Sequence, residues 1–337
     1  DVPVGILLSG GLDSSLLVGL AATRTERLHT FSIGFEDTPE ESGSEFYYSD
    51  QIVERFNTRH QQYRIPNSDV LQRLPEAVDN MAEPMVGQDA VAFYLLAEQV
   101  SREVRVVLSG QGADEVFGGY FWYPQMQAAT DSDPVTRFGR HYLDREHAEF
   151  CQTVAPAWAS VDYTRDWLAQ ELSRPDADEF MDQVMRLDVT TLIVDDPVKR
   201  VDNMTMAWGL EARVPFLDHE LVELAAQMPP EFKLRNQGKH PLKALARGLL
   251  PDSVIDRPKG YFPLPALKYV RGPALAWMRE ILTAPACRER GLYNPAYVAQ
   301  LLAAPEAETS FTRLRGSKLF HLALLESWLQ RVVERRS

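Results

Sequence analysis

The chain has 337 residues, enough for one large domain or two smaller ones with a sizeable hydrophobic core. Its 45% hydrophobic and 25% charged residues are typical of a soluble globular protein. Asp and Glu outnumber Lys and Arg by 48 to 35, and the resulting net charge of −13 argues against a nucleic-acid groove or an anionic membrane surface.

Further absences in the sequence narrow the class of protein. No apolar run is long enough to span a bilayer, and no segment resembles a signal peptide. Cys151 and Cys287 are isolated and form no C-x-x-C pair, which argues against a zinc site or a sulfur relay and favours the cytoplasm. The chain enters an apolar strand directly after Asp1-Val2-Pro3, so we expect a fragment of a longer protein.

The first glycine-rich stretch follows the apolar run at residues 4–8, which predicts a buried strand. Ser9-Gly10-Gly11-Leu12-Asp13-Ser14-Ser15 then turns the chain into a helix through Leu16, Leu17 and Leu20. Glycines let backbone N–H groups approach an oxyanion, and a helix N-terminus adds partial positive charge. A carboxylate such as Asp13 tolerates neighbouring phosphates when a divalent cation lies between them. The pattern indicates a magnesium-nucleotide loop that lacks the Walker A spacing, with a serine-capped turn as the alternative.

The next hundred residues alternate between strand and helix patterns. We expect strands at 28–35, 60–65 and 104–108, and helices at 45–56, 69–78 and 89–100. Such alternation predicts an α/β fold with a doubly wound parallel sheet, whose ligands bind beyond the carboxyl ends of the strands.

The second glycine-rich stretch is Ser109-Gly110-Gln111-Gly112-Ala113-Asp114-Glu115, and it repeats the order of the first: strand, glycine turn, acidic residue, helix. Asp114 and Asp13 would together bracket Mg²⁺ on a triphosphate. A capped turn is again the alternative when the stretch is taken alone.

Beyond about residue 125 the pattern is mainly helical. Residues 126–190 predict helices and loops, residues 191–250 predict further helices, and residues 316–333 predict a final amphipathic helix with Leu319, Leu322, Leu325 and Leu329 on one face. We therefore expect an α/β core at 1–125 and a helical extension at 126–337.

These motifs together resemble the asparagine synthetase family. SGGLDSS is similar to the SGG-x-DS signature of ATP pyrophosphatases (the PP-loop, or adenine nucleotide α-hydrolase, type), and residues 109–120 resemble the family's SGEGADE-like loop. Residues 201–218 resemble its DRMSMA…LE-x-RVPFLD run, where Asp202, Glu211 and Arg213 are candidates to line the site, with buried ion pairs as the alternative. In Gly238-Lys239-His240-Pro241-Leu242-Lys243, Lys239 falls at the family's catalytic position, with a surface lysine as the alternative.

The resemblance implies an ATP-dependent ligase that adenylates a small-molecule carboxylate and transfers ammonia to it. ATP and Mg²⁺ are the implied cofactors, Asp13 and Asp114 the implied metal ligands, and Lys239 the group that stabilises transferred charge. Glu211 and Arg213 are candidate substrate contacts, Asp202 and Gln111 candidate catalytic residues, and a homodimer stays open. The implied ATP contacts are Leu8, Ser9, Gly10, Gly11, Asp13, Ser14, Ile33, Gly34, Ser109 and Gly110.

Two departures from the family pattern concern the acceptor and the base. The family usually has glutamate at Gln111, and an amide cannot accept a proton at neutral pH. Residues 257–265 begin like RPK-x-GF and then diverge. Together these departures resemble the N-acetylglutaminylglutamine amidotransferase branch; aspartate, a β-amino acid closing to a β-lactam, and a catalytically silent ATP-binding module are the alternatives. The glutaminase domain of the family, with its N-terminal cysteine, has no counterpart in this sequence, so ammonia rather than glutamine is the expected nitrogen source.

Overall fold

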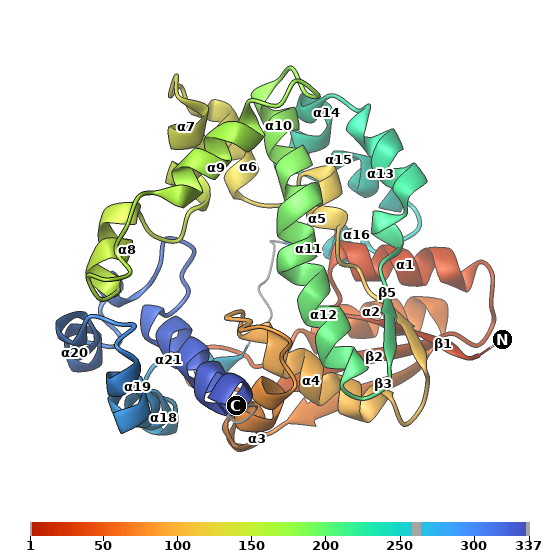
Figure 1. Cartoon of the computed structure of the whole chain (residues 1–337). Helices are drawn as coiled ribbons and strands as arrows, with labels where there is room; N and C mark the ends of the chain where they lie inside the picture. The colour runs from red at the N-terminus through yellow and green to blue at the C-terminus, as the bar shows by residue number, and fades with distance from the viewer. Residues whose placement is uncertain (1, 258–263, 335–337) are drawn as a thin grey trace.

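The computed structural model describes residues 2–257 and 264–334. Five strands form one parallel sheet in the order β3-β2-β1-β4-β5 (Figure 1). Their bounds are β1 Val4–Leu7, β2 His29–Phe35, β3 Arg59–Ile65, β4 Val106–Leu108 and β5 Glu211–Arg213. The predicted α/β class with a parallel sheet is confirmed.

Strand order creates a switch point between β1 and β4. The chain progresses outward from β1 through β2 to β3, then returns to place β4 on the other side of β1. Ile6 pairs with Leu108, so the two strands end at the same level. Both glycine-rich stretches leave the sheet from these neighbouring carboxyl ends, where doubly wound sheets bind ligands.

Helices cover both faces of the sheet because successive side chains of a strand point to opposite faces. Ile6 and Leu8 pack with Leu16 of α1 (Leu12–Ala22) on one face. Leu7 packs with Leu96 of α4 (Asp89–Val100) on the other face. The remaining core helices are α2 (Phe46–Phe56) and α3 (Asn67–Asp79), and all four lie where the sequence predicts them.

The fifth strand was not expected from the sequence, which predicts only helices between residues 191 and 250. It pairs in parallel with β4 through Val106 and Glu211. Glu211 and Arg213 are both exposed, and the strand has three residues at the sheet edge. So short and polar a segment has no hydrophobic alternation that could reveal a strand.

The rest of the chain is helical, as predicted, and wraps around the carboxyl edge of the sheet (Figure 1). The α-helices are α5 Ala113–Phe117, α6 Trp122–Ala128, α7 Pro134–Tyr142, α8 His147–Thr153, α9 Tyr163–Leu172, α10 Phe180–Leu187, α11 Ile193–Asp195, α12 Pro197–Met206, α13 His219–Ala226, α14 Pro230–Leu234, α15 His240–Ala246, α16 Asp252–Ile255, α17 Pro265–Lys268, α18 Gly272–Thr283, α19 Pro285–Arg290, α20 Pro295–Ala303 and α21 Lys318–Trp328. Short π-helical turns occur at Asp188–Leu192 and Leu329–Val333, and 3-10 turns at Pro215–Leu217, Arg235–Gln237 and Glu308–Ser310.

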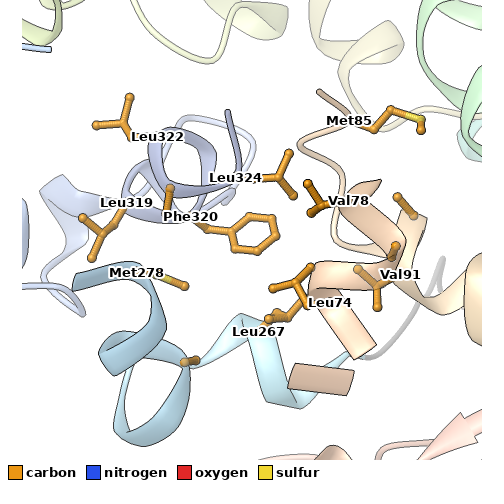
Figure 2. Packing of buried hydrophobic residues seen from close by; sticks show 14 of the residues in the cluster. Leu74, Val78, Met85, Val91, Leu267, Met278, Leu319, Phe320, Leu322 and Leu324 are labelled. Atoms are coloured by element: carbon orange, nitrogen blue, oxygen red, sulfur yellow. The ribbon is translucent and has the colours of Figure 1, made fainter. Parts of the chain in front are cut away.

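The C-terminal helix is confirmed and belongs to the largest hydrophobic cluster. Leu319, Phe320 and Leu324 of α21 are fully buried against Leu74 of α3 and Met278 of α18 (Figure 2). This packing joins α21 to α3 of the α/β core.

Two findings about the described residues bear on the sequence predictions. Within residues 2–257 and 264–334, no helix has the length and apolar character needed to cross a membrane. The divergent part of the 257–265 segment, on which the branch resemblance partly rests, lies outside the described residues.

Candidate active site

The first loop is built so that only glycine fits at its turn. Gly10 has φ +74°, and a Cβ there would lie 2.6 Å from the Ser49 backbone nitrogen. The Ser9 and Ser14 hydroxyls lie 3.0 Å apart, and Ser14 also donates to the carbonyl of Gly11 at 3.3 Å. The sequence therefore sets two hydroxyls and the first turn of α1, which carries Asp13, at the end of β1.

The second loop lies directly against the first. A Cβ on Gly110 would lie 3.1 Å from both the Asp13 Cβ and the Ser14 nitrogen, so a side chain there would push the loops apart. Gly112 has φ +92° and lets the chain turn into α5, which starts at Ala113. The loops thus bring Asp13 and Asp114 into the same space.

Lys239 joins the two loops. Its Nζ lies 2.6 Å from Asp13 Oδ2 and 2.9 Å from Asp114 Oδ1, and the residue is only 8% exposed. Burial opposes the charged ammonium, but the two carboxylates outweigh it and raise the pKa of Lys239 above its ordinary value. The lysine is therefore a fixed positive charge between two acidic residues.

The backbone has an unusual conformation at Lys239 and at the residue before it. Lys239 itself has φ +54°, a left-handed conformation that is unfavourable for a residue with a Cβ. Its N–H donates to the carbonyl of Phe117 at 3.1 Å. Gly238 precedes it with φ +90°, where a Cβ would lie 2.1 Å from the Gly118 oxygen. The segment is thereby held against the end of α5, and the strain is concentrated at the residue that faces both carboxylates.

These residues surround a pocket with a volume of about 350 Å³ at the carboxyl ends of the strands. Most of the predicted site residues line it: Leu8, Ser9, Gly11, Asp13, Ser14, Ile33, Ser109, Gly110, Gln111, Asp114 and Lys239. Gly10 and Gly34 lie outside the lining, and each has its Cβ space filled by neighbouring residues.

Three predicted residues are not brought to the pocket. Asp202 is exposed on α12. Glu211 and Arg213 pair with each other at 2.7 Å on β5, where each side chain is more than half exposed, so the alternative of a buried ion pair is wrong as well. The motif match alone could not indicate which side of the edge strand these side chains occupy.

Arg257 is a pocket residue to which the sequence assigned no role. Its Nη1 donates to the carbonyl of Gly10 at 3.0 Å, and its Nη2 pairs with Glu45. The guanidinium also lies 4.2 Å from the centre of the Tyr48 ring. Burial raises the pKa of Glu45, although Arg257 opposes this shift. Arg257 therefore holds the first loop through the carbonyl of Gly10.

Comparison with known proteins identifies the family. The family model described as asparagine synthase matches residues 1–330. The chain belongs to the asparagine synthase family. It is 28% identical to asparagine synthetase [glutamine-hydrolyzing] 1 of Bacillus subtilis (strain 168), covering 90% of this chain and 52% of that protein. A putative asparagine synthetase [glutamine-hydrolyzing] of Mycobacterium tuberculosis is 31% identical, covering 82% of this chain and 47% of the relative. The chain thus spans about half the length of these relatives.

For a member of the asparagine synthase family, the fit of Mg²⁺ can be tested on the carboxylates themselves. Asp13 and Asp114 contact one and the same cationic nitrogen, so their oxygens already converge on a single positive charge. Carboxylate oxygens are the ligands that Mg²⁺ takes, usually one or two from the protein with the rest from phosphate and water. Within the described ranges no group of three His, Cys, Asp or Glu side chains could hold a metal ion.

Two buried carboxyl groups, those of Glu115 and Asp188, lie outside the pocket lining of this asparagine synthase family member. The sequence did not indicate them. Tyr120 donates its hydroxyl hydrogen to Glu115, and Tyr123 donates to Asp188. Burial raises the pKa of Glu115 to about 7, and the nearby Asp114 adds to the shift. Burial likewise raises the pKa of Asp188 to about 8, against the hydrogen bond from Tyr123. These carboxyl groups hold their protons to much higher pH than surface carboxyls do.

Proposed function

We propose that this chain is an ATP-dependent amide-forming ligase that adenylates a carboxylate and transfers ammonia to the activated acid. The observation that carries the proposal is the contact of Lys239 with both Asp13 and Asp114 between two glycine-rich loops. Membership of the asparagine synthase family supports the reaction class.

Each of these residues has its own proposed role in the first step, the adenylation of the acceptor. The acceptor carboxylate oxygen bonds to the α-phosphorus of ATP, and the bond to the β-phosphate oxygen breaks to release pyrophosphate. Asp13 and Asp114 would hold Mg²⁺, which when bound neutralises charge on the triphosphate oxygens. Ser9, Ser14 and the loop N–H groups would bind the terminal phosphates, and Lys239 would stabilise the charge that moves onto the departing pyrophosphate.

In the second step, ammonia attacks the acyl carbon, a proton leaves the nitrogen, and AMP departs with the electron pair of the carbon–oxygen bond. Gln111 lines the pocket and offers an amide in place of a base. We therefore propose that ammonia enters this step in its unprotonated form, whichever source supplies it.

The test is pyrophosphate release by the purified chain with ATP, Mg²⁺, ammonium and a panel of carboxylic acids. We expect release that depends on one added acid, with AMP and amide formed in equal amounts. ATP binding without acid-dependent release from any member of the panel would instead favour a silent ATP-binding module and contradict the proposal.

A further inference from the structure

A cysteine and a histidine outside the active-site pocket share one face of α8. His147 and Cys151 are four residues apart, a spacing that places their side chains next to each other on a helix. Cys151 Sγ lies 3.3 Å from His147 Nε2, and both residues are half-buried. In Figure 1, α8 lies at the opposite edge of the molecule from the sheet, and none of its residues lines the pocket. The pair therefore has no role in the ligase steps proposed above.

The neighbours of His147 determine where its ring hydrogens lie. Nε2 is 2.9 Å from the carbonyl oxygen of Ser160, and a carbonyl oxygen can only accept, so Nε2 carries a hydrogen and donates it. The other ring nitrogen, Nδ1, lies 3.9 Å from Asp162 Oδ1. When the ring is protonated, each of its two N–H groups thus faces an acceptor.

The N–H on Nε2 makes the Cys151 sulfur the acceptor in their contact. A thiolate accepts a hydrogen bond better than a thiol does, because hydrogen bonds to ionised partners are about twice as strong as neutral ones. The thiolate is also the form of cysteine that acts as a nucleophile. His147 therefore offers a hydrogen-bond donor to the nucleophilic form of this sulfur.

The second cysteine of the chain has a contrasting environment. Cys287 of α19 belongs to the largest hydrophobic cluster and is 6% exposed. Burial, together with the nearby Glu326, raises the pKa of Cys287 to about 11, so this residue remains a thiol at neutral pH. Of the two cysteines, Cys151 is the one that combines solvent access with a neighbouring donor.

Exposed apolar side chains flank the pair on α8. The Phe150 ring lies 5.9 Å from the His147 ring, at an angle of 26°, and Phe150 is 39% exposed. Trp158 and Val161 lie within two residues of Ser160, which contacts His147, and both are more than half exposed. A small molecule that reaches the thiol can therefore bury apolar groups beside it.

We propose that Cys151 is a site of reversible modification by low-molecular-weight disulfides. The Cys151 thiolate attacks one sulfur of the disulfide, a new S–S bond forms, the old S–S bond breaks, and the second sulfur leaves as a thiolate. Cys151 is thereby oxidised and the departing half of the disulfide is reduced, while the proton of the Cys151 thiol passes to solvent. Attack by a free thiol on the mixed disulfide reverses the reaction. This inference goes beyond the proposed ligase function and does not depend on it.

The first experiment treats the purified chain with glutathione disulfide and measures the mass of the intact protein and of its peptides. We expect one glutathionyl group per chain, located on Cys151 and released by dithiothreitol. Cys151→Ser should lose the adduct, and Cys287→Ser, the matched control, should keep it. Modification of Cys287 to the same extent, or the absence of an adduct on Cys151, would overturn the proposal.

A second measurement tests the part that His147 plays. Dithiodipyridine releases a coloured thiopyridone as it reacts, so it reports the rate of attack by Cys151 at neutral pH. His147→Asn should slow this reaction by about 10-fold, because it removes a hydrogen bond to an ionised sulfur. His219→Asn, which changes an exposed histidine on α13, should leave the rate unchanged. Equal rates for His147→Asn and wild type would show an ordinary surface thiol and contradict the site.

Discussion

Two neighbouring carboxyl groups on α5 show how differently the two sides of this helix are built. Asp114 faces the pocket and contacts the Lys239 ammonium, while Glu115 faces inward, is 1% exposed and accepts a hydrogen bond from Tyr120. A cation stabilises the ionised form of the first, and burial favours the protonated form of the second. Adjacent residues of one motif thus have carboxyl groups in different electrostatic environments because their partners differ.

The same contrast extends beyond α5. On the pocket side, Lys239 and Arg257 hold glycine loops through charged contacts. On the inner side, Asp188 and Glu115 are bound by tyrosine hydroxyls among buried side chains of the helical region. We infer that residues on the pocket side act in the reaction and that residues on the inner side affect the stability of the fold, and four substitutions test this division.

Lys239→Ala should have the largest effect. Its removal leaves Asp13 and Asp114 without their shared cation and takes away the charge that stabilises the departing pyrophosphate, so turnover should fall by about 1,000-fold. Pyrophosphate release measures the loss, with ATP binding by calorimetry and the far-UV spectrum as checks of an intact fold. Lys268→Ala, which removes an exposed lysine paired with Glu41, is the control, and unchanged turnover in Lys239→Ala would exclude the catalytic assignment.

Asp114→Asn and Glu115→Gln compare the two sides of α5 directly. The first should weaken binding of Mg·ATP by about 100-fold and raise the magnesium concentration needed for half-maximal rate, because it removes one of two carboxylates available to the ion. The second should change the magnesium requirement by less than about threefold, since Glu115 does not line the pocket. Equal magnesium dependence of the two variants would contradict the proposed division.

Asp188→Asn should have the smallest effect on activity and a pH-dependent effect on stability. The native chain holds the Asp188 proton with a pKa of about 8, against an ordinary value of 3.8, so it binds this proton more tightly than the unfolded chain does. The carboxyl therefore makes the free energy of unfolding decrease as pH rises from about 4 to about 8. Asn does not titrate, so the free energy of unfolding of the variant relative to wild type should increase by about 4 kcal/mol between pH 5 and pH 9, nearly all of it below pH 8.

Urea unfolding across this pH range measures the difference. Asp133→Asn is a control whose difference from wild type should not change with pH over this range, because hydrogen bonds from Thr136 and Arg165 lower the pKa of Asp133 to about 2. Asp133 stabilises the fold above its ordinary pKa and loses that contribution as pH falls toward 2. A constant difference between Asp188→Asn and wild type at every pH would show that Asp188 is ionised in the fold.

Much of the fold follows from patterns that a sequence displays. Helices α1 to α4 and the C-terminal helix are long enough to show a period of 3.6, β1 and β4 lie within apolar runs, and each glycine loop begins where one of these runs stops. The strand Glu211–Arg213 shows no such pattern, because its register is set by pairing with β4 rather than by its own side chains. Its place in the sheet depends on a contact between segments about a hundred residues apart.

The candidate site likewise contains some residues that the sequence predicts and others that it does not. Asp13, Asp114 and Lys239 carry recognisable motifs, and the structure brings them together. Glu45 carries none, because its place at the pocket depends on Arg257, which approaches from a distant part of the chain. The positions of Asp202, Glu211 and Arg213 show the converse: a motif match finds a segment but does not fix which side chains of that segment turn toward the pocket.

The backbone hydrogen bond from Lys239 to Phe117 has a consequence for folding during synthesis of the protein. Its backbone N–H closes a contact with Phe117 across more than a hundred residues, and a loop of that length forms only after its far end exists. A nascent chain that has just completed α5 has both glycine loops and both carboxylates but lacks the Lys239 ammonium that contacts them.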